Sequence, residues 1–437
     1  MRDFSRGALA LTLLAATAAA QIRLPVQPLP LPALPLQGAA QNLNQTDPRL
    51  LTQLSAVRHL EVDRLIRANR NVLDRDPNGE PIIRNEILAL SPNETAAALA
   101  RSLQLIVARD QIIDSMSIHL VVYRAPDTAS TNKALRELRA SDPAGVYDYN
   151  HIYLGSGARS APMAGPTAQN APLQAPSAAP LQESKMRVGL VDTGVDTSHP
   201  AFQESAIRTW GCGNRLVPAA HGTAVASLMI GRAQGFHGVQ PDAALYAADV
   251  YCGEPTGGAV DALVAALAWL VQEQVPVINI SLVGAKNSIL EQAVARTIAR
   301  GFIIVAAVGN DGPAAPPLYP ASYPNVVGVT AVDAHRHVLI EAARGPQVMF
   351  ASPGADLAAA SIAHGYAAVR GTSFAAPIVA GLLAASISAP GTDNVDAAIA
   401  ALAKSAIDLG APGRDLTYGY GLVGAEYRID PAPLLHR

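Results

Sequence analysis

Three widely separated residues have the side-chain types needed for nucleophilic catalysis: Ser373, His221 and Asp192. Ser373 follows a Gly-Thr turn and opens a run of small and apolar residues, 373–388, which predicts a buried helix. The free backbone N–H groups at a helix N-terminus favour developing negative charge, as a nucleophile requires. Serine is also a common N-cap residue, so this motif alone does not establish a nucleophile.

His221 and Asp192 are of the types that can supply the base and the orienting carboxylate that a serine nucleophile needs. An alcohol is a poor nucleophile at neutral pH, and a neutral imidazole within hydrogen-bond reach can take its proton. A carboxylate that binds the imidazole fixes its tautomer and stabilises the imidazolium that forms. We therefore predict Ser373 as nucleophile, His221 as general base and then acid, and Asp192 as the orienting group. The side-chain amide of Asn310, directly after an apolar stretch, could donate to the oxyanion beside the Ser373 backbone N–H.

The elements that must position these residues lie between residues 185 and 437. Continuous apolar stretches there alternate with helical patterns, which predicts strands covered on both faces. We expect an α/β fold, a mostly parallel doubly wound sheet with helices on both faces. The expected strands are 186–191, 244–250, 275–281, 302–308, 325–331 and 348–352, and the expected helices include 221–231, 260–274 and 288–300. Ligands bind at the carboxyl ends of such strands, which is where Asp192, Ser281 and Asn310 lie.

The motifs around these residues resemble those of the subtilisin-like serine proteases (subtilases). The matching sequences are Val-Asp-Thr-Gly-Val at 191–195, His-Gly-Thr at 221–223, Gly-Asn-Asp-Gly at 309–312 and Gly-Thr-Ser-Phe-Ala-Ala-Pro at 371–377. The chain order Asp, His, Ser is the one that this family uses. Phe374 stands where the family usually has methionine, and both side chains are apolar.

The resemblance also implies a substrate site. The four residues Ser281, Leu282, Val283 and Gly284 are similar to the strand that pairs with the substrate backbone and forms one wall of the S1 pocket. An ordinary strand end is the alternative for this segment. Leu318 falls where the family has the floor of S1, which implies a shallow, apolar pocket. The resemblance implies no cofactor; we assign no metal ligand and leave structural calcium open.

The first residues have the pattern of an export signal. Residues 1–20 carry Arg2 and Arg6, then an apolar run at 8–20 that ends in three alanines. The run is too short to span a bilayer. We expect an exported protein, either secreted or periplasmic. Residues 21–51 are rich in proline and predict an extended linker.

Residues 52–154 alternate helical and strand patterns and predict a small α+β domain. Expected helices are 56–72, a helix ending near 108 and 131–140, and expected strands are 81–90, 116–123 and 146–154. Ser91 and Glu94 fit the N-cap and N3 positions of a capping box. Residues 155–184, mostly Ala, Pro, Gly and Ser, predict a flexible connector that proteases can cut.

This layout resembles that of subtilase propeptides, which assist folding and block the active site. The resemblance implies a zymogen in which residues 147–154 are the blocking strand, making the N-terminal domain an intramolecular inhibitor and chaperone. A permanent accessory domain is the alternative.

The composition narrows the remaining choices. Half of the residues are apolar and 15% are charged, which excludes a disordered chain, and the net charge of −3 indicates no nucleic-acid partner. The apolar stretch 374–389 contains Pro377, so we expect a core helix and no membrane span in the mature protein. Cys212 and Cys252 are the only cysteines, and export favours a disulfide between them.

These observations predict an exported serine endopeptidase that acts on polypeptides through an acyl-enzyme. A peptidyl transferase or ligase with the same intermediate is one alternative, and a catalytically silent peptide-binding relative is another.

Overall fold

The computed structural model describes residues 48–155, 173–174, 186–362 and 364–435. The signal peptide expected at 1–20, most of the linker and most of the connector lie outside these residues. The chain divides into two compact units, residues 1–46 and 47–437, and every described residue belongs to the second.

A seven-stranded sheet forms the centre of the fold, and each adjacent pair of its strands is parallel. Its order is β18-β17-β16-β14-β7-β12-β8. The strands are β7 (Arg187–Asp192), β8 (Ile207–Trp210), β12 (Ala244–Asp249), β14 (Val277–Ile280), β16 (Ile303–Ala307), β17 (Val327–Val332) and β18 (Val348–Pro353). Apart from the edge strand β8, their side chains are almost entirely buried, as continuous apolar runs predict.

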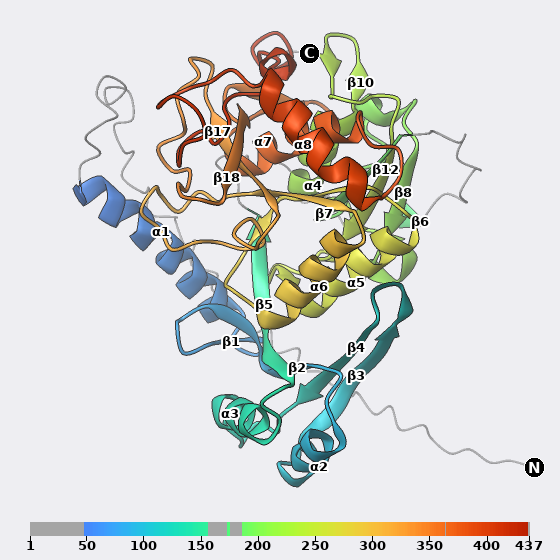
Figure 1. The fold of residues 1–437 in the computed structure, drawn as a ribbon, viewed down its shortest axis with the longest axis vertical. Coiled ribbons are helices and arrows are strands. Elements are labelled where there is room, and N and C mark those ends of the chain that lie inside the picture. The colour runs from blue at the N-terminus through green and yellow to red at the C-terminus, as the bar shows by residue number, and fades with distance from the viewer. Residues whose placement is uncertain (1–47, 156–172, 175–185, 363, 436–437) are drawn as a thin grey trace, which may run out of the picture. The chain divides into compact units, whose positions relative to one another are not determined.

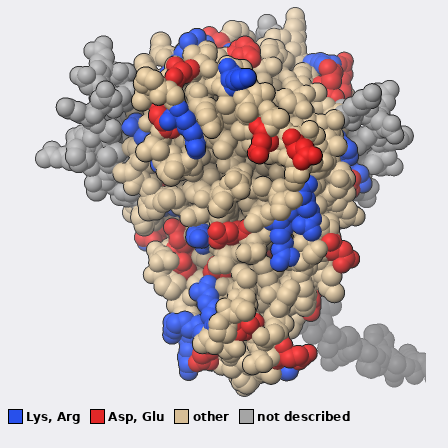
Figure 2. Space-filling view, in the orientation of Figure 1, with Lys and Arg blue, Asp and Glu red and all other residues tan. Residues whose placement is uncertain are grey.

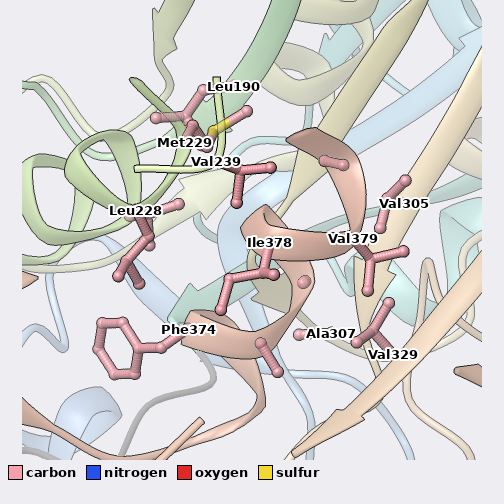
Figure 3. Packing of buried hydrophobic residues seen from close by; sticks show 14 of the residues in the cluster. Leu190, Leu228, Met229, Val239, Val305, Ala307, Val329, Phe374, Ile378 and Val379 are labelled. Carbon is pink, nitrogen blue, oxygen red and sulfur yellow. The ribbon is translucent and has the colours of Figure 1, made fainter. Parts of the chain in front are cut away.

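Helices cover both faces of this sheet, which confirms the predicted fold class (Figure 1). On one face, α4 (Ala220–Ile230) and α7 (Thr372–Ala384) pack on the strands, and α8 (Thr392–Ser405) contacts α7. Figure 3 shows Phe374, Ile378 and Val379 of α7 among side chains of the strands and α4. On the other face lie α5 (Val260–Gln272) and α6 (Ser288–Ala299).

An antiparallel sheet forms the N-terminal module, by which we mean residues 48–155. Its strands are β1 (Leu73–Arg75), β2 (Pro81–Leu90), β3 (Ile106–Ile113), β4 (Ile118–Arg124) and β5 (Val146–Gly155). One face packs on α2 (Glu94–Ser102) and α3 (Thr131–Ser141), and apolar residues of the other face join the cluster around α5 and α6. The α+β arrangement expected for this region is therefore present, and α5 and α6 are shared between the two sheets.

The structure differs from the sequence-based expectations at three places in this module. The first helix, α1, spans Pro48–Ala68, so it begins inside the predicted linker. The N-cap of α2 is Asn93, whose side chain accepts from the Ala96 N–H, while Ser91 has a φ of 45° that an N-cap does not adopt. That helix ends at Ser102, because the β-branched residues that follow form β3.

Charged side chains are interspersed on the surface. On the face drawn in Figure 2, acidic and basic residues are mixed and are separated by a majority of uncharged residues. Of the helices in the described part of the chain, none combines the length and the apolar character needed to cross a membrane.

Candidate active site

The predicted acid and imidazole form a pair at the carboxyl end of the central sheet. Asp192 is the last residue of β7, and His221 lies in the first turn of α4. His221 Nδ1 and Asp192 Oδ1 are 2.7 Å apart, and the Asp192 side chain is fully buried. The backbone N–H of Thr193 also donates to Asp192 Oδ1, at 2.7 Å. These contacts fix the carboxylate against one edge of the imidazole and leave the other nitrogen, Nε2, for a different partner.

Two opposing effects act on the pKa of His221. Burial lowers the pKa, because it disfavours the charged imidazolium. The negative charge of Asp192 and its hydrogen bond raise the pKa, and together they outweigh burial, so the pKa lies above its ordinary value. The imidazole is thus a stronger base than a free histidine.

Ser373 is the second residue of the adjoining helix, α7, and is completely buried. Its hydroxyl donates to the backbone oxygen of Ser281 at 3.1 Å, and the ring of the next residue, Phe374, lies tilted beside the His221 ring with the ring centroids 5.5 Å apart. Among the described residues, Nε2 of His221 has no hydrogen-bond partner. The direct Ser373–His221 hydrogen bond predicted from the sequence is therefore replaced by a bond to Ser281. Such bonds are often absent without substrate and form in the reacting complex.

The side-chain amide oxygen of Asn310 accepts a hydrogen bond, whereas its nitrogen has no partner among the described residues. Its Oδ1 accepts the backbone N–H of Thr372 at 3.1 Å, and the Thr372 hydroxyl in turn accepts from the Gly309 N–H. Its Nδ2 is buried and has no partner in the described part of the chain. A buried donor without an acceptor costs about 1–3 kcal/mol, so its presence indicates a position that a ligand oxygen would fill.

The segment predicted to bind substrate, residues 281–284, pairs with the end of β5. Strand β15 (Leu282–Val283) pairs antiparallel with β5, with Leu282 opposite Gly155 and Val283 opposite Leu154. On the other side β13 (Gly258–Ala259) also pairs with β5. A Cβ atom built on Gly155 would lie 3.3 Å from the His221 ring. The chain's own extended segment therefore ends against the imidazole.

The remaining predicted residues lie close by. Ser281 is fully buried, and its hydroxyl donates to the Ser373 backbone oxygen at 2.9 Å. We call residues 309–312 the asparagine loop; Leu318 is buried against it, since a Cβ on Gly309 would lie 2.5 Å from the Leu318 Cδ1. Of the predicted substrate-binding residues, Ser281 thus contacts Ser373 and Leu318 packs on Gly309, whereas Leu282 and Val283 pair with β5.

Comparison with known proteins decides the family. The sequence profile of the subtilase family matches residues 183–421, which is more than half of the chain. The chain belongs to the subtilase family. Within that family, it is 31% identical to subtilisin DY of Bacillus licheniformis over 251 residues, 56% of this chain and 90% of that protein. It is 32% identical to the minor extracellular protease Epr of Bacillus subtilis over 207 residues, 46% of this chain but only 32% of Epr.

Solved structures show the same fold. Fervidolysin of Fervidobacterium pennivorans superposes with a TM-score of 0.62 at 20% identity, over 81% of this chain and 62% of that one. This share exceeds the part matched by the family profile, so the likeness of fold extends beyond the central sheet. Family membership makes this subtilase a serine protease that hydrolyses peptide bonds.

The predicted disulfide is present between Cys212 and Cys252. Beside it, the buried carboxylate of Asp249 accepts the N–H groups of Tyr251 and Cys252, both at 2.9 Å. Burial raises the pKa of Asp249, and the nearby Asp192 raises it further. Sequence reasoning missed Asp249, whose one signal was its place at a strand end. Cys212, Asp249 and Cys252 group like metal ligands, but the disulfide uses both thiols.

Ionic contacts between the N-terminal module and this subtilase's site loops were also missed. Arg58 of α1 has its Nε 3.2 Å from Asp311, the residue after Asn310, and its Nη2 3.0 Å from Glu80. Burial raises the pKa of Asp311, although the charge of Arg58 opposes this. No local sequence signal joins an arginine to a carboxylate some 250 positions away, because the pairing depends on how the two sheets pack.

A second polar network joins the module to α5 and α6. Glu86, only 2% exposed, accepts from Arg109, which also pairs with Asp261 of α5 at 2.8 Å. Asn287, the N-cap of α6, donates to the Tyr149 backbone oxygen and contacts the His151 ring at 2.9 Å. The buried Glu86 carboxylate and the buried Asn287 amide thereby each have a hydrogen-bond partner, and the amide finds its partner across the contact.

Proposed function

We propose that this subtilase is an exported serine endopeptidase made as a zymogen, with Asp192, His221 and Ser373 as its triad. One observation carries the proposal. Among the described residues, the buried His221 Nε2 and Asn310 Nδ2 have no hydrogen-bond partner; they lie beside a serine in the first turn of a helix, and strand β5 reaches the imidazole. A proton acceptor and an oxyanion donor are thus both present where a scissile carbonyl would lie.

The reaction proceeds in two stages. The Ser373 Oγ attacks the substrate carbonyl carbon while His221 Nε2 accepts the hydroxyl proton, and Asn310 Nδ2 with the Ser373 N–H binds the oxyanion. The tetrahedral intermediate collapses as the C–N bond breaks and His221 returns its proton to the leaving amine. Water then attacks the acyl-enzyme, with His221 again as the base, and releases the carboxylate.

Before processing, the N-terminal module acts as an intramolecular inhibitor and chaperone. Its support is the pairing of β5 with both β13 and β15, which occupies the position that an extended substrate would take. A sheet dominated by long-range parallel pairings forms slowly, and a docked module supplies a template for it. Cleavage in the connector at 155–184 would separate the module from the enzyme.

Export has its own support. The first residues have the pattern of a signal peptide, and the relative named above from Bacillus subtilis is an extracellular protease. The disulfide fits an oxidising compartment.

The full-length gene and a Ser373→Ala variant test the proposal together. We expect the wild type to lose its N-terminal module and to hydrolyse denatured casein, with product masses that show the addition of water. The variant should stay joined to its module and leave casein intact. A Ser373→Ala protein that cleaves casein at the wild-type rate would contradict the proposal, and products formed by transpeptidation would point to a ligase.

A further inference from the structure

Helix α8 lies on the outside of the protein and buries few of its side chains (Figure 1). Of its 14 residues only Ala398 is buried, whereas almost every residue of the neighbouring α7 is buried. The exposed residues of α8 include Ala397, Ala400 and Ala401, although the exposed positions of a surface helix are usually polar. This side of α8 therefore offers little polar surface to water.

A groove of about 830 Å³ borders α8. The residues that α8 contributes to its lining are spaced three or four positions apart along the helix, so they lie on one face of it. We call this surface the α8 groove and define it by six of its lining residues: Met349, Asp396, Ile399, Ala400, Lys404 and Tyr420. The lining is mainly apolar and includes one acidic and one basic side chain.

Exposed apolar side chains gather in the segment that follows α8. Five large apolar residues are exposed in the described part of residues 186–435, and three of them are Ile407, Leu416 and Tyr420. This segment is held beside the α8 groove, because the Tyr420 N–H donates to the backbone oxygen of Met349 at 2.8 Å and both residues line the groove. A partner that covered the groove would remove part of this apolar surface from water, which favours association.

The two charged residues of the α8 groove indicate which partner fits. Asp396 and Lys404 are exposed and lie eight positions apart, about 12 Å along the helix axis, so they cannot pair with each other. Ala400 lies midway, one turn from each. A two-fold axis through Ala400 would place Asp396 of one copy opposite Lys404 of the other, and the reverse pair would form as well, as an interface between identical chains requires.

We propose that the α8 groove is an interface at which two copies of this chain associate, with their α8 helices antiparallel and crossing at Ala400. The small side chain at the crossing lets the two helices approach closely. Ile407, which follows the end of α8, then reaches the beginning of the other α8, where Val395 lines the groove. None of these residues belongs to the predicted active site, so the interface is independent of the proposed chemistry.

Exchanging the two charges tests this inference by sedimentation equilibrium of the full-length Ser373→Ala chain. In Asp396→Lys two basic side chains face each other across the interface, and in Lys404→Asp two acidic ones do. We expect either variant to raise the Kd of the dimer by about tenfold or more, because opposed like charges are unfavourable at an interface. An equimolar mixture of the two variants should dimerise as the parent chain does, since every pair then joins opposite charges.

Glu94→Lys on α2 is the control, because it makes the same change of charge at an exposed position outside the α8 groove. It should leave the Kd unchanged. A parent chain that stays monomeric at submillimolar concentration would overturn the inference and leave the groove to a different partner. Single variants that dimerise as well as the parent chain would also overturn it, as would a mixture of the two that stays monomeric.

Discussion

The contact between α1 and the asparagine loop gives the sharpest prediction about inhibition. Substituting Arg58→Ala removes the cation that lies between Asp311 and Glu80, at 3.2 and 3.0 Å. The Arg58 and Asp311 side chains are only 13% and 17% exposed, so water replaces the guanidinium poorly. Two carboxylates then remain near each other in a largely buried position.

The magnitude follows from this burial. Removing one partner of a buried ion pair costs about 3–5 kcal/mol, and we take about 2 kcal/mol because this pair retains some solvent contact. At 1.36 kcal/mol per factor of ten, the detached state of α1 should become about 30 times more populated.

Amide hydrogen exchange in the catalytically inert Ser373→Ala chain measures that population directly. Most of the stability of a helix in a protein comes from its tertiary packing, so the amides of α1 exchange when it leaves the surface. We expect Arg58→Ala to speed exchange in α1 about 30-fold. Arg67→Ala on the same helix is the control, because the Arg67 side chain is 54% exposed and, among the described residues, pairs with Asp63 alone, at 3.8 Å. Unchanged exchange in Arg58→Ala, or an equal effect of Arg67→Ala, would refute the reasoning.

Three further predictions concern the site itself. Activity should rise with pH as His221 loses its proton, with an inflection above the ordinary pKa of a histidine. Asp192→Asn should move that inflection to lower pH, because only burial then shifts the pKa of His221. An unmoved pH–rate profile in this variant would contradict the prediction. Asn310→Ala should lower kcat by about 10²–10³ with little change in KM, the size measured for oxyanion donors elsewhere, whereas an effect on KM alone would show a binding role. Replacing Cys212 and Cys252 with alanine should lower the free energy of unfolding by about 4 kcal/mol, because a disulfide that closes a separation of 40 residues restricts the unfolded chain. Denaturant titration of the Ser373→Ala chain measures this change. A decrease of less than about 1 kcal/mol would contradict the stabilisation expected from loop closure.

Much of the fold could be predicted because local patterns and tertiary structure agree. The strands of the central sheet are buried on both faces, so their apolar runs are visible in the sequence without knowledge of their partners. Asp192 ends such a strand and Asn310 follows another, so their place at the carboxyl ends of the central strands was predictable. The helix of Ser373 was visible for the same reason, although it ends at Ala384 rather than 388.

The features that were missed depend on contacts between distant segments. Strand β3 is an edge strand with mostly exposed side chains, so it lacks the alternation that would have separated it from the preceding helix. The Arg58–Asp311 pair exists only because the N-terminal module packs beside the asparagine loop. The Ser373 hydroxyl turns toward Ser281, a choice between rotamers that no sequence pattern specifies.

Labelling by a fluorophosphonate, followed by peptide mapping, tests the central claim most directly. The reagent reacts with a serine only when a base removes its proton and an oxyanion site holds the phosphoryl oxygen. We predict a single adduct on Ser373 in the processed protein and loss of labelling in His221→Ala. An adduct on another serine, or none in a preparation that hydrolyses casein, would contradict the assignment of Asp192, His221 and Ser373.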